Sequence, residues 1–206
     1  LILYIIFTVN TTFSQEEVAK KILNQMSEKG RTYTDITAEF TLNFSNENLE
    51  INENSTGKIW IKGDMYKLDM SSDLSIINNG ETLWYFMKDV PEVQVMDSDP
   101  EDEMNPSKIF TIYERGYKFK YEDSISENGI DLHVINMYPE KNGIISKVVL
   151  YVDSKTKDLY KILINDKDGG ISTYRINSFI TNSNITESIF SFKKKDYPEV
   201  EIIDLR

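Results

Sequence analysis

A run of short, alternating segments between residues 57 and 95 restricts the fold more than any other feature of the chain. Residues 57–62 read GKIWIK, 65–70 read MYKLDM, 81–87 read ETLWYFM and 92–95 read EVQV, and each has the length of a β-strand. Apolar and polar side chains alternate with a period of two in most of them, as in strands with one buried face. Gly63-Asp64 and Asn79-Gly80 favour tight hairpin turns between the segments. The pattern therefore predicts an antiparallel meander with one apolar face.

The acidity of the chain and its lack of cysteine exclude several classes of protein. The 206 residues contain 34 acidic and 23 basic side chains, for a net charge of -11. Binding to nucleic acid requires concentrated Lys and Arg, so we expect no nucleic-acid partner. Without cysteine the chain forms no disulfide and no thiolate zinc site, and it carries no lipid-bearing cysteine of its own. A chain of this length can bury one substantial core, and we expect a single domain at residues 15–206.

The first residues indicate export. Residues 1–14 read LILYIIFTVNTTFS, an apolar run that ends in small residues at Thr12 and Ser14. This pattern matches the hydrophobic region and cleavage site of a secretory signal, here truncated at its start. A membrane anchor is the alternative, but about 13 apolar-leaning residues fall short of the ~20 that a spanning helix needs. We therefore expect residues 1–14 to be a cleaved signal peptide.

The rest of the chain predicts two helices and further strands. Val18, Ile22, Leu23 and Met26 share one helical face, so residues 15–29 form an amphipathic helix that Gly30 ends. A second, short helix follows Asn105-Pro106, over residues 107–114. Strands beyond the meander are predicted at residues 36–44, 49–51, 117–121, 130–138, 144–152, 159–165, 171–179 and 189–192, which gives about ten or eleven strands in all.

The sequence lacks the motifs of an enzyme. The only histidine, His133, falls inside a predicted strand, and no Gly-x-Ser-x-Gly elbow or glycine-rich phosphate loop occurs. The acidic run at residues 97–103 lacks the ligand spacing of a calcium loop, so we interpret it as a solvated loop. We expect no catalytic residue, no cofactor and no metal.

A single antiparallel sheet of this size has to curl, because each strand is rotated relative to its neighbour. Two short helices are all that the sequence offers to cover its apolar concave face. The interior is then either filled by its own bulky side chains or partly hollow, in which case it forms a pocket for an apolar ligand. Periodicity alone favours the filled interior, with the pocket as the alternative.

Two of the motifs resemble those of a known family. The GKIWIK segment, followed about twenty residues later by NGETLWYF at residues 79–86, resembles the G-x-L-W-V-K and D-G-K-T-L-W-x-Y signatures of the periplasmic outer-membrane lipoprotein carrier family, LolA. The similarity extends to the helix at residues 15–29, the NPSKIF segment at 105–110 and the strand at 144–152 with its DSKT turn. It also includes the FSF segment at 190–192 and VEIID at 200–204.

This resemblance implies an α+β fold, a single curved antiparallel sheet that forms an unclosed half-barrel covered by amphipathic helices. It also implies a hollow interior and the function of a non-enzymatic periplasmic chaperone. Such a carrier is expected to act as a monomer. It takes acylated lipoproteins from an inner-membrane ABC-type releasing complex to an outer-membrane acceptor. The alternatives are an envelope regulator that senses lipoproteins or lipids, and a carrier of another lipid on the same fold.

The resemblance and the alternation together predict the lining of the cavity. Matching positions in the family place Tyr66, Leu68, Trp84, Phe86 and Ile109 there. Alternation alone adds Phe40, Leu42, Phe44, Ile59, Ile61, Met70, Val93, Val95 and Phe119. Ordinary core packing is the competing interpretation for each of them.

The turn after residue 62 departs from the family pattern. Family members place an Arg followed by Pro after W-V-K, and that Arg ties the sheet to the lid. Here Lys62 is followed by Gly63-Asp64, so the family's lid contact does not carry over to this chain.

Overall fold

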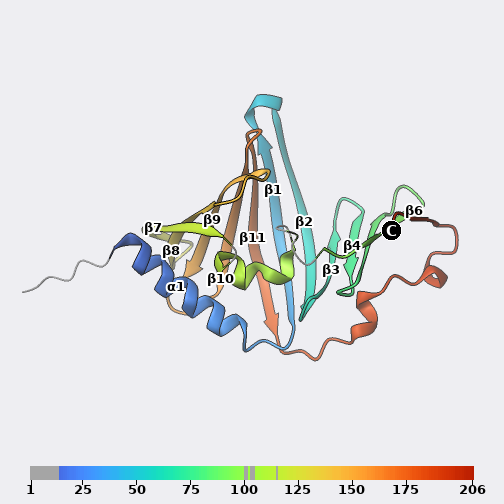
Figure 1. The fold of residues 1–206 in the computed structure, drawn as a ribbon, viewed down its shortest axis with the longest axis horizontal. Coiled ribbons are helices and arrows are strands. Elements are labelled where there is room, and N and C mark those ends of the chain that lie inside the picture. The colour runs from blue at the N-terminus through green and yellow to red at the C-terminus, as the bar shows by residue number, and fades with distance from the viewer. Residues whose placement is uncertain (1–13, 100–101, 103–104, 115) are drawn as a thin grey trace, which may run out of the picture.

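The computed structural model describes residues 14–99, 102, 105–114 and 116–206 (Figure 1). The predicted signal peptide therefore lies outside the described residues, apart from Ser14. Ser14 caps helix α1 (Gln15–Gly30): its hydroxyl accepts from the backbone N–H of Glu17, and the Glu17 carboxylate accepts from the N–H of Ser14. The predicted amphipathic helix is confirmed. In the described residues, no helix is both long enough and apolar enough to cross a membrane.

Twelve strands form one sheet, in the order β12-β6-β5-β4-β3-β2-β1-β11-β10-β9-β8-β7. Neighbours are antiparallel throughout, except that β12 joins β6 in parallel. In the described part of the chain, β12 and β7 are the two ends of this order and do not pair, so the sheet is unclosed. The strands are β1 (Ile36–Asn46), β2 (Ile51–Lys62), β3 (Met65–Met70), β4 (Leu74–Asn78), β5 (Thr82–Met87), β6 (Glu92–Asp97), β7 (Tyr117–Glu127), β8 (Ile130–Pro139), β9 (Ile145–Asp153), β10 (Leu159–Asp166), β11 (Gly170–Thr181) and β12 (Glu201–Asp204).

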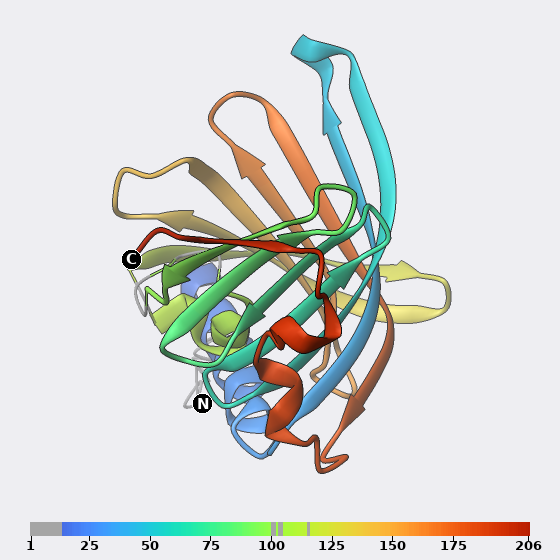
Figure 2. The same cartoon turned by 90° about the vertical axis from the view of Figure 1, so that its right-hand side faces the viewer.

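The sheet curls around two helical segments (Figures 1 and 2). Helix α1 and the 3₁₀ helix η2 (Pro106–Glu114) lie inside the curve, and their apolar side chains pack onto the sheet. We call the face that they contact the helix-side face, and the opposite one the outer face. The predicted single curved, unclosed sheet is thus confirmed, with twelve strands in place of ten or eleven and one parallel pair.

Two segments differ from the sequence-based expectation. Residues 189–192 do not form a strand, because the chain there turns through the 3₁₀ helices η3 (Glu187–Phe190) and η4 (Lys194–Asp196). The polar stretch between Ile51 and Thr56 is part of β2, although it has little strand propensity of its own. Its partner β1 holds it extended through a register that runs from Ile51 opposite Asn46 to Thr56 opposite Thr41.

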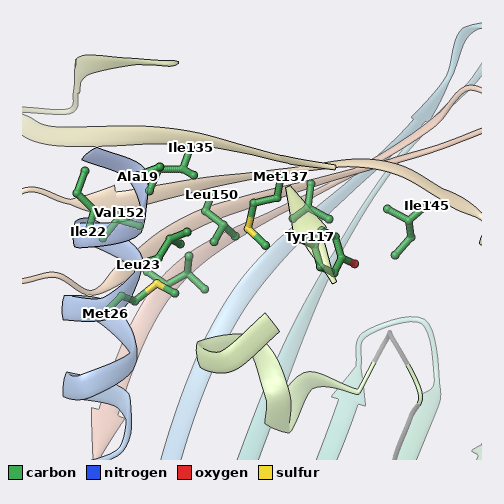
Figure 3. Close-up of a cluster of buried hydrophobic side chains, with 12 residues drawn as sticks. Ala19, Ile22, Leu23, Met26, Tyr117, Ile135, Met137, Ile145, Leu150 and Val152 are labelled. Carbon is green, nitrogen blue, oxygen red and sulfur yellow. The ribbon is translucent and has the colours of Figure 1, made fainter. Parts of the chain in front are cut away.

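The main hydrophobic core lies between α1 and one end of the sheet (Figure 3). Leu23 and Met26 of α1 are fully buried, as are Ile135 of β8 and Leu150 of β9. Figure 3 shows these side chains meeting between the helix and the strands, with η2 alongside. The chain therefore fills its own interior at the β7–β10 end.

Candidate functional site

The pairing register shows which side chains share the helix-side face beyond this core. Residues directly opposite each other in neighbouring antiparallel strands project from the same face. Ile61 is opposite both Ile36 and Tyr66, and these three side chains form a buried cluster that includes Phe110 of η2. The next row runs Ile59, Leu68, Ile76 and Tyr85 across β2 to β5. The apolar face thus continues from the core across the meander.

Helix η2 covers the middle of this face. Phe110 makes edge-on ring contacts with Tyr33 at 6.1 Å and with Phe179 at 6.4 Å between centroids. Gly30, the last residue of α1, allows this arrangement, because a Cβ there would lie 2.7 Å from Cγ of Phe110. An aromatic cluster therefore joins the two helices to the sheet.

Beyond η2 the helix-side face is apolar but only half-buried. We call this surface the concave patch; it consists of Leu42, Phe44, Ile59, Leu68, Ile76 and Leu83. Met87, farther along β5, is 42% exposed. These side chains form an apolar surface that the described residues leave partly open to solvent.

Two tyrosines next to the concave patch, Tyr66 and Tyr174, are neutral at physiological pH. Burial raises the pKa of the Tyr66 hydroxyl, against the opposing effect of a hydrogen bond with Asn78. Burial likewise raises the pKa of Tyr174, which a hydrogen bond with Ser172 partly offsets. Neither side chain therefore places a charge beside the apolar surface.

A hollow of about 470 Å³ lies where β1, β2 and β3 meet. Phe40, Gly57 and Met70 supply its apolar part, and Glu39, Lys58 and Asp69 are among its polar residues. Phe40 and Met70 close over Gly57, because a Cβ at position 57 would lie only 2.3 Å from Cζ of Phe40 and 2.7 Å from the Met70 sulfur. This glycine lets two large side chains lie flat on the strand.

The predicted residues Trp84, Phe86, Val93 and Val95 lie on the outer face, and the expectation that they share one surface with Tyr66 and Leu68 is wrong. Trp84 is opposite Ile77, which is opposite Lys67, whereas Tyr85 continues the row of Leu68 and Ile76. Phe86 and Val93 instead pack with Phe192 and Val200 of the C-terminal segment. Strand β5 is apolar at every position from Leu83 to Met87, so alternation could not decide which face it buries.

The other predicted residues lie on the helix-side face, in three surroundings. Ile109 and Phe119 pack against the main core. Ile61, Tyr66, Phe40 and Met70 are buried around η2 and Gly57. Leu42, Phe44, Ile59 and Leu68 belong to the concave patch. Whether any of them contacts a ligand stays a prediction.

Sequence reasoning missed several residues of this face. Tyr174 and Ile176 alternate with polar neighbours in β11, so their pattern could have identified them. Ile76 and Tyr85 could not be found in this way, because each has an apolar neighbour in sequence. Their place follows only from pairing with Leu68.

Ion pairs hold the two helical segments in place. Lys108 of η2 pairs with Asp64 in the β2–β3 turn. Arg31 pairs with Glu114 at 2.7 Å, and Lys29 pairs with Asp158 at 2.6 Å. A carboxylate on the turn and a lysine on the helix thus link the sheet to η2 in this chain.

Catalytic or metal-binding clusters are not evident in the described residues. No group of three or more His, Asp or Glu side chains there comes together as a metal ion would require. His133 lies in β8 opposite Val152, and burial, together with the charge of Lys157, lowers its pKa. The imidazole is therefore neutral at pH 7, in a strand position typical of a packed side chain.

The sequence of this chain matches the model of a known protein family. The model of the outer membrane lipoprotein carrier protein LolA matches residues 31–193, which is most of the chain. The chain belongs to the LolA family. The match spans every strand of the sheet except β12, together with η2. Comparison with curated proteins found no matching sequence.

Solved structures share the LolA-like fold at low sequence identity. An uncharacterized conserved protein from Thermus thermophilus is 12% identical with a TM-score of 0.61, over 91% of this chain and 99% of that one. A DUF1329 family protein from Desulfovibrio piger is 10% identical with a TM-score of 0.51, over 87% and 98%. A LolA superfamily protein from Nitrosomonas europaea is 14% identical over 84% and 97%, with a TM-score of 0.47. The first two likenesses establish the fold alone.

Proposed function

We propose that this chain is a periplasmic carrier that binds the acyl chains of lipoproteins on the concave patch. It receives them from an inner-membrane ABC-type releasing complex and delivers them to an outer-membrane acceptor, without catalysing a reaction. Membership of the LolA family supports this proposal. The observation that carries it is the half-buried apolar face that α1 and η2 leave uncovered.

The free energy of hydrocarbon transfer explains why such a surface is needed. Each methylene gains about 0.8 kcal/mol on leaving water, so a C16 chain costs roughly 12 kcal/mol to expose. A carrier in an aqueous compartment has to cover that chain. The bilayer offers the same gain, so the carrier exchanges lipid close to equilibrium, and extraction requires an external source of energy.

A charge placed on the concave patch tests the proposal. We expect Leu68→Glu to abolish binding of a fluorescent C16 fatty acid to the delipidated protein, because a carboxylate there would be desolvated beneath the chain. The fold should persist, since Leu68 is only half-buried. Fluorescence titration measures the binding, and circular dichroism checks the fold.

Ile180→Glu is a matched control, because it makes a similar change on the outer face. Ile180 is 53% exposed and opposite Thr37, whose other partner is the outer-face residue Trp60. This variant should bind the fatty acid like the wild type. Undiminished binding by Leu68→Glu would remove the concave patch from the proposed site.

A further inference from the structure

Strand β2 extends beyond β3 and leaves a step in the sheet. It pairs with β1 from Ile51 to Ile61, but with β3 only from Gly57 to Lys62. We call residues 51–56 the β2 step; in the described part of the chain they have a strand on one side only. Figures 1 and 2 both show the β1–β2 hairpin projecting well past the end of β3.

The backbone of the β2 step offers hydrogen-bonding groups along this open side. The N–H of Thr56 donates to Oγ of Ser71 at 2.9 Å, and its carbonyl accepts from the N–H of Ser71 at 2.8 Å, both on the side of β3. Because these directions repeat every second residue, the N–H and C=O groups of Asn52 and Asn54 also point away from β1. Both residues are exposed. Two donors and two acceptors thus face outward in strand geometry.

The two ends of the sheet are protected, and the β2 step is not. Strand β12, at one end of the sheet, has only four residues, and so short an edge strand offers little length for pairing. Edge strand β7 carries Lys118 and Lys120 and an irregularity after Tyr121, features that discourage further pairing. The β2 step contains no Lys, no Pro and no register shift against β1. Its edge is therefore suited to accept another strand.

The charges around the step indicate which strand it would accept. Glu47, Glu50 and Glu53 surround it, and Glu53 lies directly opposite Phe44, on the face of the concave patch. A second copy of this chain would bring the same carboxylates and a net charge of -11, so like charges would repel. An extended segment with basic side chains complements the step.

We propose that the β2 step binds the extended polypeptide segment next to the acyl chain of the cargo, as an added strand. The basic side chains of this added segment pair with Glu53, and the acyl chain of the cargo continues from Phe44 across the concave patch. Six residues at about 3.3 Å each give roughly 20 Å of edge, enough for a short strand. The identity of this cargo rests on the proposed function.

Amide hydrogen exchange tests the added strand directly. The probe is a palmitoyl chain on a six-residue peptide of alternating valine and lysine, compared with palmitate alone. We expect the lipopeptide to slow exchange of the Asn52 and Asn54 amides at least tenfold and palmitate to leave it unchanged. The amides of Glu53 and Ser55 point toward β1 and serve as internal controls.

Substitution of Asn54 by proline tests the same added strand by mutation. Asn54→Pro removes an N–H that points away from β1, so pairing with β1 is retained. It should weaken lipopeptide binding about tenfold, the effect of losing one or two hydrogen bonds, with palmitate binding unchanged. Asn54→Ala keeps the N–H and should bind like the wild type. If the proline variant does not fold, amide hydrogen exchange of Asn52 and Asn54 in the wild type decides alone whether the strand is added.

The outcomes separate this inference from the proposed function. Binding of palmitate and lipopeptide without protection of Asn52 and Asn54 would overturn the added strand and leave the carrier function intact. Failure of both probes to bind would overturn both proposals. Concentration-dependent protection of these amides without any probe would assign the edge to a second copy of this chain and overturn the inference.

Discussion

The packing of two large side chains on the helix-side face, Phe40 and Met70, depends on one small residue, Gly57. Alternation identified Tyr66 and Leu68 correctly as neighbours on one face, because Lys67 between them and Asp69 after them are polar. It could not reveal the role of Gly57, whose missing Cβ leaves room for Phe40 and Met70. That role depends on a contact between strands, which no local pattern records.

Gly57→Ala should therefore disturb the packing between β1 and β3. The new methyl group would overlap the Phe40 ring, which is buried and has little room to move. We expect a loss of about 1–3 kcal/mol in the free energy of unfolding, the usual cost of overpacking. Urea denaturation measures it, with Lys58→Ala on the outer face as the control. Equal stability of Gly57→Ala and the wild type would contradict this account of the glycine.

The elements differ in how far their place follows from local sequence. Helix α1 was predictable from its apolar spacing and cap, and β7 from the alternation of its aromatic residues with lysine. The β2 step was not, because β1 keeps its polar residues extended. Strand β12 has four residues and takes its parallel partner from a segment about a hundred residues away. Which face β5 buries also depended on its partners. Pairing between distant strands determines the place of the β2 step, the place of β12 and the face that β5 buries.

The C-terminal segment, residues 182–206, is fastened to the start of β1 by Asn182, whose Oδ1 accepts from the N–H of Thr34 at 2.8 Å, and by the carboxylate of Asp35. Asp35 accepts hydrogen bonds from the backbone N–H groups of Ser183 at 2.8 Å and Asn184 at 2.9 Å, and from the Ser183 hydroxyl at 2.9 Å. Burial raises the pKa of Asp35, but these bonds outweigh it and hold the pKa below the ordinary value of 3.8. The segment continues over the outer face to β12 (Figure 2).

Removing this charge should loosen the C-terminal segment. Asp35→Asn should cost about 1–3 kcal/mol at pH 7 and speed exchange of the Ser183 and Asn184 amides. Because the folded pKa is lowered, the stabilisation is complete above the unfolded value and is lost as pH falls through the folded one. The difference between wild type and variant should therefore shrink below about pH 4.

Asp153→Asn is the control for this experiment. Asp153 caps the β9–β10 turn by accepting from the backbone N–H groups of Lys155 and Thr156, and its substitution should leave the C-terminal amides unaffected. A difference between wild type and Asp35→Asn that is constant down to pH 2 would show that the carboxylate charge is not what fastens the segment.

At the scale of the whole molecule, the sheet has two apolar faces that are covered differently. The C-terminal segment covers the outer face around Phe86 and Val93. On the helix-side face, α1 and η2 cover the β7–β10 end and leave the concave patch half-buried. Family resemblance predicted a hollow interior, and the described residues show an open apolar surface beside a filled core. Both tryptophans lie on the outer face, Trp60 opposite Lys67 and Trp84 opposite Ile77.

Quenching of tryptophan fluorescence by a brominated C16 fatty acid tests the binding face most directly, because bromine quenches an indole only near contact. Wild-type emission, from Trp60 and Trp84, should stay nearly unchanged when the delipidated protein is saturated. Leu68→Trp should add emission that the bound chain quenches strongly. Strong quenching of the wild type, or none in a Leu68→Trp variant that binds the chain, would contradict the assignment of the acyl chain to the concave patch.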